Sequence, residues 1–195
     1  MKPQQLTLAV ALALPSSFLS IAYADSITEA LVNGKASANL NLRYETVSQD
    51  NAKKDADAFT LRTRLTYATG SIKGFSALVE FEDSRNVFGI DDYNNTLGKN
   101  PDYSVIADPE TTELDQAFVQ YKQENLAVKA GRQVITMDNH RFVGHVGWRQ
   151  DRQTFDGLTA AYQPIKDLNL QYGYISKRNR IFAEAKDINS SDHII

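Results

Sequence analysis

Hydrophobic and polar side chains alternate along most of this chain, and this alternation restricts its fold more than any other feature. Between Asp57 and Ser84, in DAFTLRTRLTYATGSIKGFSALVEFEDS, two alternating runs flank a short break bounded by glycines. In the first run the leucines and aromatic residues share one parity, whereas Arg62 and Arg64 share the other. Successive side chains of a β-strand point to opposite faces, so the pattern predicts strands. We therefore expect a hairpin with one apolar face and one charged face.

The same period recurs in seven segments, and segments of about ten residues suit a tilted strand that crosses a membrane. The connections alternate between longer polar loops and tight turns such as QEN and QPIKD. Outer-membrane barrels share this asymmetry, with short periplasmic turns and longer outer loops. Besides the two strands of the Asp57–Ser84 hairpin, the predicted strands are Lys35–Val47, Glu113–Lys122, Leu126–Ile135, Thr154–Tyr162 and Leu168–Ile175, with a long loop over Asp83–Thr112.

These patterns predict an all-β fold, an antiparallel transmembrane β-barrel. The apolar parity would face lipid and the polar parity would line a wet lumen. An arginine that faces lipid at the midplane costs roughly 2–4 kcal/mol, and an inward position avoids this cost. A secreted β-sandwich would alternate as well. Its connections would have no reason to alternate in length, so the barrel is favoured.

Residues 1–24 differ from the rest of the chain. Lys2 is the only charged residue before Asp25, and the apolar run Leu6–Leu14 is followed by a small-residue AYA motif. This predicts a secretory signal peptide, cleaved before Asp25, and a mature unit that comprises residues 25–195. The apolar run is too short to span a bilayer core about 30 Å thick.

Composition and motifs exclude several classes of function. The formal net charge of −3 gives no reason to expect a nucleic-acid partner, and the absence of cysteine excludes a thiolate metal site. His140 and His145 lack a recognised metal-ligand spacing, and Asp91–Asn95 resembles only a fragment of a calcium loop. We find no serine–histidine–acid motif and no phosphate-binding loop. We therefore expect no enzymatic activity, no cofactor and no metal.

Several stretches together resemble a known family. They are FTLRTRLTYATGSIKGFSALVEFED, DYNNT, DYSVIADPETTELDQAFVQYK, GRQVITMDNHRFVGHVGWRQDRQTFD and NRIF. In this order they are similar to the alginate-export-type outer-membrane porins of Gram-negative bacteria. The resemblance implies a β-barrel channel for anionic or saccharide-like solutes, located in the outer membrane. It also implies contact with outer-membrane lipid and lipopolysaccharide, and with the barrel-assembly machinery.

The chain departs from that family in its number of strands. Seven strands are fewer than such barrels need, and single-chain bacterial barrels have even numbers. The final SDHII resembles the start of a further strand, and no terminal aromatic residue follows. We therefore expect either the N-terminal portion of a longer barrel or a truncated product. Open sheet edges do not survive in lipid, so such a piece alone would not form a pore.

Basic residues on the inward parity are the first candidate solute-binding group. One interpretation is a positive ladder that attracts carboxylated solutes, because rings of Arg and Lys select anions in pores. The other is internal ion pairing with Glu45, Glu80, Glu82 and Asp115. Arg132 falls on the lipid parity, so either a bulge at Gly131 resets the alternation or Arg132 lies above the apolar band. The basic residues in question are Arg43, Arg62, Arg64, Lys129 and Arg132.

The second candidate group lies between Met137 and Gln153. An inward-folded loop there would present guanidinium groups and an aromatic surface to a sugar acid. The alternative is a solvated loop that packs on the rim. The residues concerned are Arg141, Trp148, Arg149 and Arg152. The function expected is passive transport of small anionic or saccharide solutes. The alternatives are a surface or adhesin-like barrel and a secreted polysaccharide-binding β-sandwich.

Overall fold

The computed structural model describes residues 10–11 and 26–195, which form one antiparallel sheet with neighbouring strands in chain order. The described residues contain no second sheet, so the β-sandwich alternative does not hold. The strands are β1 (Val10–Ala11), β2 (Lys35–Val47), β3 (Ala56–Ala68), β4 (Phe75–Asp92), β5 (Thr111–Gln123), β6 (Leu126–Gln133), β7 (Thr154–Ile165), β8 (Leu168–Asn179) and β9 (Ile188–Ile194).

The helical elements are short: α1 (Ile27–Val32) and the 3-10 turns η1 (Asp138–His140) and η2 (Glu184–Lys186). At α1, the Ser26 Oγ accepts a hydrogen bond of 3.1 Å from the Glu29 N–H, as an N-cap does. None of the helices in the described part is long and apolar enough to cross a membrane. The predicted signal peptide lies outside the described residues except for Val10–Ala11, so it stays a prediction.

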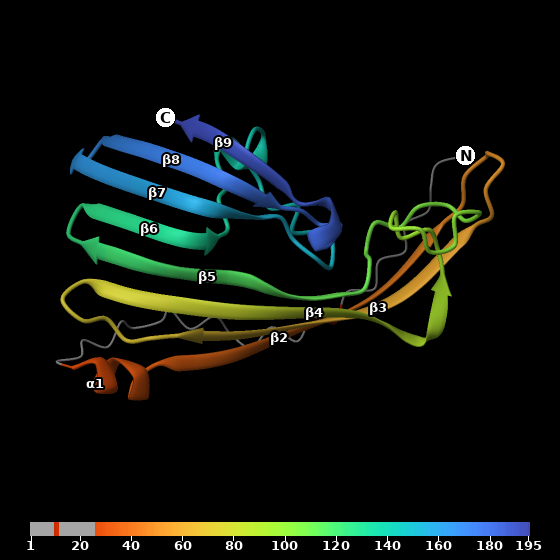
Figure 1. Ribbon diagram of the computed structural model, residues 1–195, viewed down its shortest axis with the longest axis horizontal. Coiled ribbons are helices and arrows are strands. Elements are labelled where there is room, and N and C mark those ends of the chain that lie inside the picture. Colours follow the sequence, from red (N-terminus) through yellow and green to blue (C-terminus); the bar gives the residue numbers. More distant parts are fainter. Residues whose placement is uncertain (1–9, 12–25) are drawn as a thin grey trace.

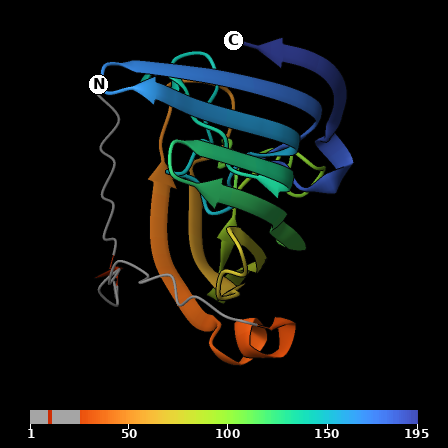
Figure 2. The same cartoon turned by 90° about the vertical axis from the view of Figure 1, so that its left-hand side faces the viewer.

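The sheet curls into an open, partial barrel with different connections at its two ends (Figures 1 and 2). The turns that join β3 to β4, β5 to β6 and β7 to β8 lie at one end, where α1 also lies. The longer connections lie at the other end, including residues 93–110 and 134–153. Among the described residues β9 pairs only with β8, and the sheet does not close. The predicted asymmetry of turns and loops is confirmed.

All seven predicted strands form, but the predicted Asp83–Thr112 loop is partly wrong. β4 continues to Asp92, because Asp91 and Asp92 pair with the start of β3 after a shift in register. Cross-strand pairing outweighs the weak strand propensity of this polar, glycine-containing stretch. The final segment also forms a strand, β9, which begins earlier than SDHII alone indicated.

Burial in this sheet is the reverse of that in a water-soluble protein. Charged residues of β2, β3 and β4 are buried, among them Arg43, Arg62 and Glu82. Large apolar side chains of the same strands are exposed, with Leu65 55% exposed. The predicted division into an apolar outer face and a polar inner face is therefore confirmed. Other exposed apolar residues on the strands include Leu40, Phe75, Phe81, Val119, Leu158, Tyr162, Leu170 and Tyr172.

A substitution on the outer face can test whether that face contacts hydrocarbon. We expect Leu65→Arg to lower the free energy of unfolding in lipid by about 2–4 kcal/mol, the range for arginine facing the bilayer midplane. Leu65→Ala, the control, removes the same side chain without adding charge and should cost less. Urea titration in phospholipid vesicles measures both. Equal free energies for the two variants would show that Leu65 does not face hydrocarbon.

Candidate functional site: a loop folded onto a charged inner face

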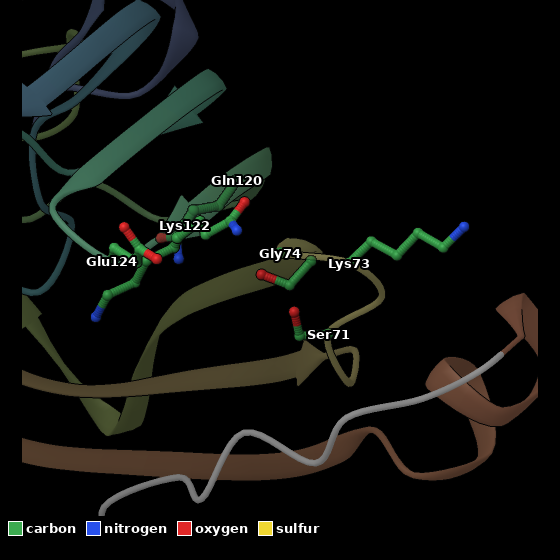
Figure 3. Close-up of a pocket in the computed structure, with 8 residues that line it drawn as sticks. Ser71, Lys73, Gly74, Gln120, Lys122 and Glu124 are labelled. Carbon is green, nitrogen blue, oxygen red and sulfur yellow. The ribbon is translucent and has the colours of Figure 1, made fainter.

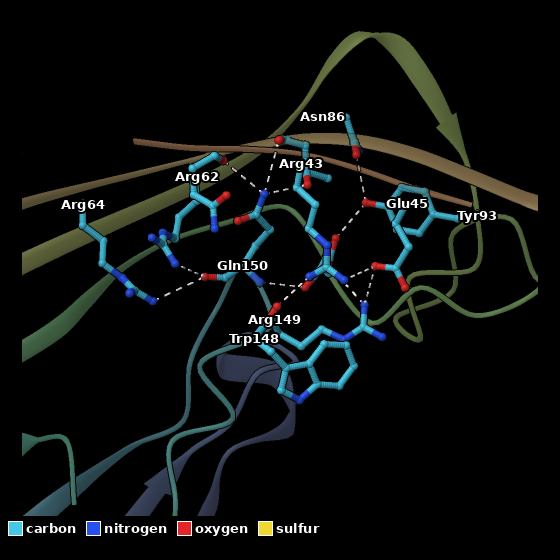
Figure 4. Close-up of polar contacts among 12 residues, drawn as sticks. Arg43, Glu45, Arg62, Arg64, Asn86, Tyr93, Trp148, Arg149 and Gln150 are labelled. Atoms are coloured by element: carbon cyan, nitrogen blue, oxygen red, sulfur yellow. Dashed lines mark hydrogen bonds and ion pairs between the residues drawn. The ribbon is translucent and has the colours of Figure 1, made fainter. Parts of the chain in front are cut away.

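The connection between β6 and β7, residues 134–153, folds onto the concave face of the sheet, and we call it the inner loop. Its tip, Arg149–Arg152, contacts side chains or backbone of β2, β3, β4 and β5. Figure 4 shows Arg43, Arg62 and Arg64 converging on this tip. The predicted inward fold is therefore what the structure shows.

Gln150 anchors the tip, and it is completely buried. Its Nε2 donates hydrogen bonds to Thr60 Oγ1 at 2.7 Å and to the Thr60 carbonyl at 3.2 Å. Its backbone N–H donates to Asp108 Oδ1 at 2.9 Å, and its carbonyl accepts from Arg62 at 3.5 Å and Arg64 at 3.4 Å. One residue thus joins the inner loop to β3 and to the β4–β5 loop (Figure 4).

Arg149, next to the anchor, joins a group of two arginines and two acids. Its Nη1 lies 3.1 Å from Glu45 Oε2 and 3.2 Å from Asp108 Oδ2. Arg43 pairs with the same two acids and donates a hydrogen bond of 2.7 Å to the Trp148 carbonyl. The Arg149 guanidinium also lies 4.1 Å from the Trp148 ring centroid, a cation–π contact. Both arginines are therefore engaged in internal contacts.

Arg152 forms a second group on the other side of the tip. It pairs with Glu80 and, at 2.7 Å, with Asp115. Arg64 pairs with Glu82 and lies 3.3 Å from Asp115. Asp115 reaches the inner face because a register shift beside Glu80 leaves it as an extra residue of β5.

Arg62 differs from the other arginines at the tip. It donates a hydrogen bond of 2.5 Å to Asn39 Oδ1 and contacts the Gln150 carbonyl, and its side chain is buried. Within the described residues no carboxylate lies within 4.0 Å of its guanidinium. Arg62 is therefore a buried cation without a direct ion pair.

The buried tip of the inner loop also carries Asp151. Burial, together with the negative charges of Glu113 and Glu82, raises the pKa of Asp151 to about 9. Asp151 is therefore protonated at neutral pH. The inner charge cluster comprises Arg43, Arg62, Arg64, Arg149 and Arg152 with Glu45, Glu80, Glu82, Asp108, Asp115 and Asp151.

Five arginines thus meet six acids, of which Asp151 is uncharged at pH 7. Every acid named for the ion-pairing interpretation, Glu45, Glu80, Glu82 and Asp115, contacts an arginine. The contacts therefore follow that interpretation at Arg43 and Arg64, and the cluster is not strongly positive.

The remaining predicted residues lie away from the tip. Lys129 is on the inner parity, with its Nζ 4.9 Å from the Phe118 ring centroid. Arg132 lies on the outer parity, where its Nε is 2.7 Å from Asp156 Oδ1. The pairing of β6 runs without a register shift through Gly131, so no bulge returns Arg132 to the inner face. The structure therefore separates Arg132 from the other candidates.

Arg141 and Trp148 lie on the exposed part of the inner loop. The Arg141 guanidinium is 5.6 Å from the Phe142 ring centroid and forms no ion pair within the described part of the chain. Trp148 is 62% exposed. The rings of His140 and His145 are 4.6 Å apart. Within the described residues, no three His, Cys, Asp or Glu side chains are grouped so that they could hold a metal ion.

Sequence reasoning missed Gln150, Asp108 and Asp151. Nothing local marks Gln150 as an anchor, because its partners are far away along the chain. Asp108 lies in a loop of many acids, and no spacing distinguishes it. Asp151 lies between Gln150 and Arg152, and a buried position for an acid in such a polar stretch is not predictable from composition.

A hollow of about 440 Å³ lies at the end with the short turns. The β3–β4 turn contributes Ser71 and Gly74, the end of β5 contributes Lys122, and the β5–β6 turn contributes Glu124. Figure 3 shows the Lys73 side chain extending away from Gln120. The hollow brings together no group of catalytic or metal-binding side chains.

Loss of the Gln150 side chain should release the inner loop. We expect Gln150→Ala to weaken docking by about 1–3 kcal/mol, because it leaves buried partners unsatisfied. Limited trypsin digestion measures this as faster cleavage after Arg149 and Arg152, relative to cleavage after the exposed Arg141. The control is Gln153→Ala, because among the described residues the Gln153 Nε2 bonds only to the Gly144 carbonyl of the same loop. Equal cleavage ratios in both variants would contradict the anchor role.

Docking should also depend on pH through Asp151. Its pKa is raised from 3.8 to about 9 in the docked state, so the docked state keeps a proton that the released state loses above about pH 4. The stabilisation from this proton falls as pH rises and is lost near pH 9. We expect the trypsin ratio to increase between pH 7 and pH 9.5. Asp151→Asn should remove the dependence, and an unchanged wild-type ratio would refute it.

The comparisons with known proteins agree with this architecture. A family model described as alginate export matches residues 35–172, from the start of β2 into β8. Searches of curated proteins and of solved structures found no match. The matched region includes the inner loop and every residue of the inner charge cluster. The chain belongs to the alginate export family, a family of outer-membrane proteins.

Proposed function

We propose that these strands belong to an outer-membrane β-barrel channel through which small anionic or saccharide solutes diffuse passively. The observation that carries this proposal is the reversed burial of the sheet, with charges inside and aliphatic side chains outside. Family membership supports a channel in the outer membrane. The solute class and the passive mode of transport are the parts that we add.

Aromatic side chains at both ends of the strands support a membrane position for the sheet. At the short-turn end, the rings of Phe75 and Tyr121 lie 4.8 Å apart. At the long-loop end, Phe59 contacts Tyr44 at 5.9 Å and Phe88 at 5.1 Å between centroids. Aromatic belts of this kind mark the two membrane–water interfaces of outer-membrane barrels. In the proposal, the strands between these belts contact lipid, and lipopolysaccharide surrounds the long-loop end.

The inner loop supports a constricted channel. It occupies space on the concave side of the sheet, and its anchor and ion pairs fix it there. A loop held by buried charges keeps a constant pore width without a moving gate. Closure of the barrel requires partners for both sheet edges, because lipid cannot satisfy open backbone groups. We propose that the barrel-assembly machinery binds this protein while its sheet edges are being paired.

The size of the pore tests the constriction. Replacement of residues 144–152 by a short Gly–Ser linker should increase single-channel conductance in planar lipid bilayers, because it empties the concave side. The control shortens residues 95–100 of the β4–β5 loop, which make no hydrogen bond or ion pair to the inner charge cluster in the described part of the chain. Unchanged conductance after removal of the inner loop tip would contradict the proposed constriction. Absence of any conductance in a preparation whose sheet edges are paired and whose barrel is closed would favour a surface-binding barrel over a channel.

Charge selectivity tests the role of Arg62. Arg62→Ala removes the one arginine of the inner charge cluster that lacks a direct carboxylate partner in the described residues. We expect the reversal potential in a KCl gradient to shift toward cation preference, whereas Arg62→Lys should keep the wild-type value. Arg132→Ala is the matched control, because Arg132 has the outer parity and is already paired with Asp156. Identical shifts for Arg62→Ala and Arg132→Ala would contradict the assignment.

A further inference from the structure

We propose that α1 lies in the membrane–water interface at the short-turn end, with Ile27 and Leu31 directed among the acyl chains of the phospholipid leaflet there. The proposal assigns a lipid-binding role to a segment outside the strands of the sheet. It rests on the proposed function, because the aromatic belt at the short-turn end defines the level of this interface.

The helix exposes three aliphatic side chains that the described part of the chain does not cover. Ile27 is 73% exposed, Leu31 51% and Val32 78%. Ile27 and Leu31 are four residues apart, so they project from the same face of the helix. Successive helical residues are rotated by about 100°, so Glu29 lies on the opposite face. The helix is therefore amphipathic, although it has only six residues.

Contacts with the sheet fix the orientation of α1. The Gly70 N–H donates a hydrogen bond of 2.8 Å to the carbonyl of Ala30, which is buried. The Tyr67 hydroxyl donates a hydrogen bond to the Leu31 carbonyl. A side chain at Gly34 would collide with the Tyr67 ring, so glycine after the helix allows this close approach. The end of β3 and the β3–β4 turn therefore determine which face of α1 points away from the sheet.

Tyr67 shows on which side of the sheet α1 lies. It shares the parity of Leu65, which is exposed on the outer face, and it pairs with Ala36 at the start of β2. Because its hydroxyl reaches the Leu31 carbonyl, the end of α1 lies against the outer face. Figure 1 shows α1 at the short-turn end, beside the start of β2. The exposed face of α1 therefore continues the apolar surface that the proposed function places in lipid.

At this end β2 lacks the aromatic side chain that several other strands carry on the outer parity. Those of the other strands are Tyr67 in β3, Phe75 in β4, Tyr121 in β5 and Tyr162 in β7. The outer residues at the start of β2 are Ala36 and Ala38, which are small. Amphipathic helices can lie in the interface plane with their apolar face among the acyl chains. In this position α1 supplies the apolar surface that β2 lacks and holds the start of β2 at the level of the headgroups.

The absence of cysteine from the chain allows a site-by-site test. The full chain is prepared as Ile27→Cys, Leu31→Cys, Glu29→Cys and Leu65→Cys, each labelled with a nitrobenzoxadiazole dye and reconstituted in phospholipid vesicles. The lipids carry a nitroxide quencher either near the headgroup or deep in the acyl chain. We expect blue-shifted emission and strong quenching by the shallow nitroxide at Ile27 and Leu31. Glu29, the matched control on the opposite face, should be quenched least, and Leu65 should respond relatively more to the deep nitroxide.

The pattern of quenching separates this proposal from the proposed function. Quenching at Leu65 without quenching at Ile27 and Leu31 would overturn the role of α1 and leave the lipid-facing sheet intact. Equal quenching at Glu29, Ile27 and Leu31 would also overturn it, because no face of the helix would then be directed to lipid. Blue-shifted emission that nitroxide lipids do not quench would place a protein surface, such as a second copy of the chain, on this face and would overturn the lipid assignment.

Two further outcomes concern the sheet itself. Absence of quenching at all four positions would contradict both the role of α1 and the proposed membrane position of the sheet. Quenching at Ile27 and Leu31 but not at Leu65 would retain the lipid contact of α1 and contradict the proposed position of the sheet.

Discussion

Charged side chains that are buried away from bulk water need ion-pair or hydrogen-bond partners. On the inner face of this sheet, the inner loop supplies many of these partners. Five arginines and the acids around them come from β2 to β5 and from two loops. Removal of one partner from a buried ion pair typically costs about 3–5 kcal/mol, whereas the pair itself adds little net stability. The cluster therefore specifies where the loop lies more than it stabilises the chain. Gln150 and the outward presentation of Trp148 both depend on that position.

Much of this architecture is predictable from alternation alone. The strand Lys35–Val47 is predicted with the bounds that β2 has, and the charged parity of β3 is the buried one. Alternation predicts the strands because successive residues of a barrel strand face lipid and lumen in turn, and each environment favours a different polarity. It fails where the ladder is irregular. The ion-pairing interpretation placed Asp115 inside, yet strict alternation from Gln116 would point it outward. The extra residue in β5 turns it inward.

The candidate site was less predictable, because it is built from contacts between distant segments. The sequence shows that the loop is rich in arginine and glycine, but not which arginines are occupied. Arg149 and Arg141 are both arginines of the inner loop, so the sequence does not distinguish their roles. In the fold, Arg149 lies beside Glu45, whereas Arg141 is exposed. The pKa of Asp151 also depends on neighbours from β4 and β5. The composition of the loop therefore identified it as a candidate site, whereas the geometry of the fold assigns different roles to its arginines.

The account depends most on the claim that the outer face meets hydrocarbon while the inner face meets water. A photoactivated carbene probe dissolved in the bilayer tests this claim on the unmodified protein, with labelled residues mapped by mass spectrometry. The account predicts labels on Leu65 and Phe81, which are exposed on the outer face, and none on Arg64 and Glu82. Labels on Arg64 and Glu82, with Leu65 and Phe81 unmodified, would contradict it.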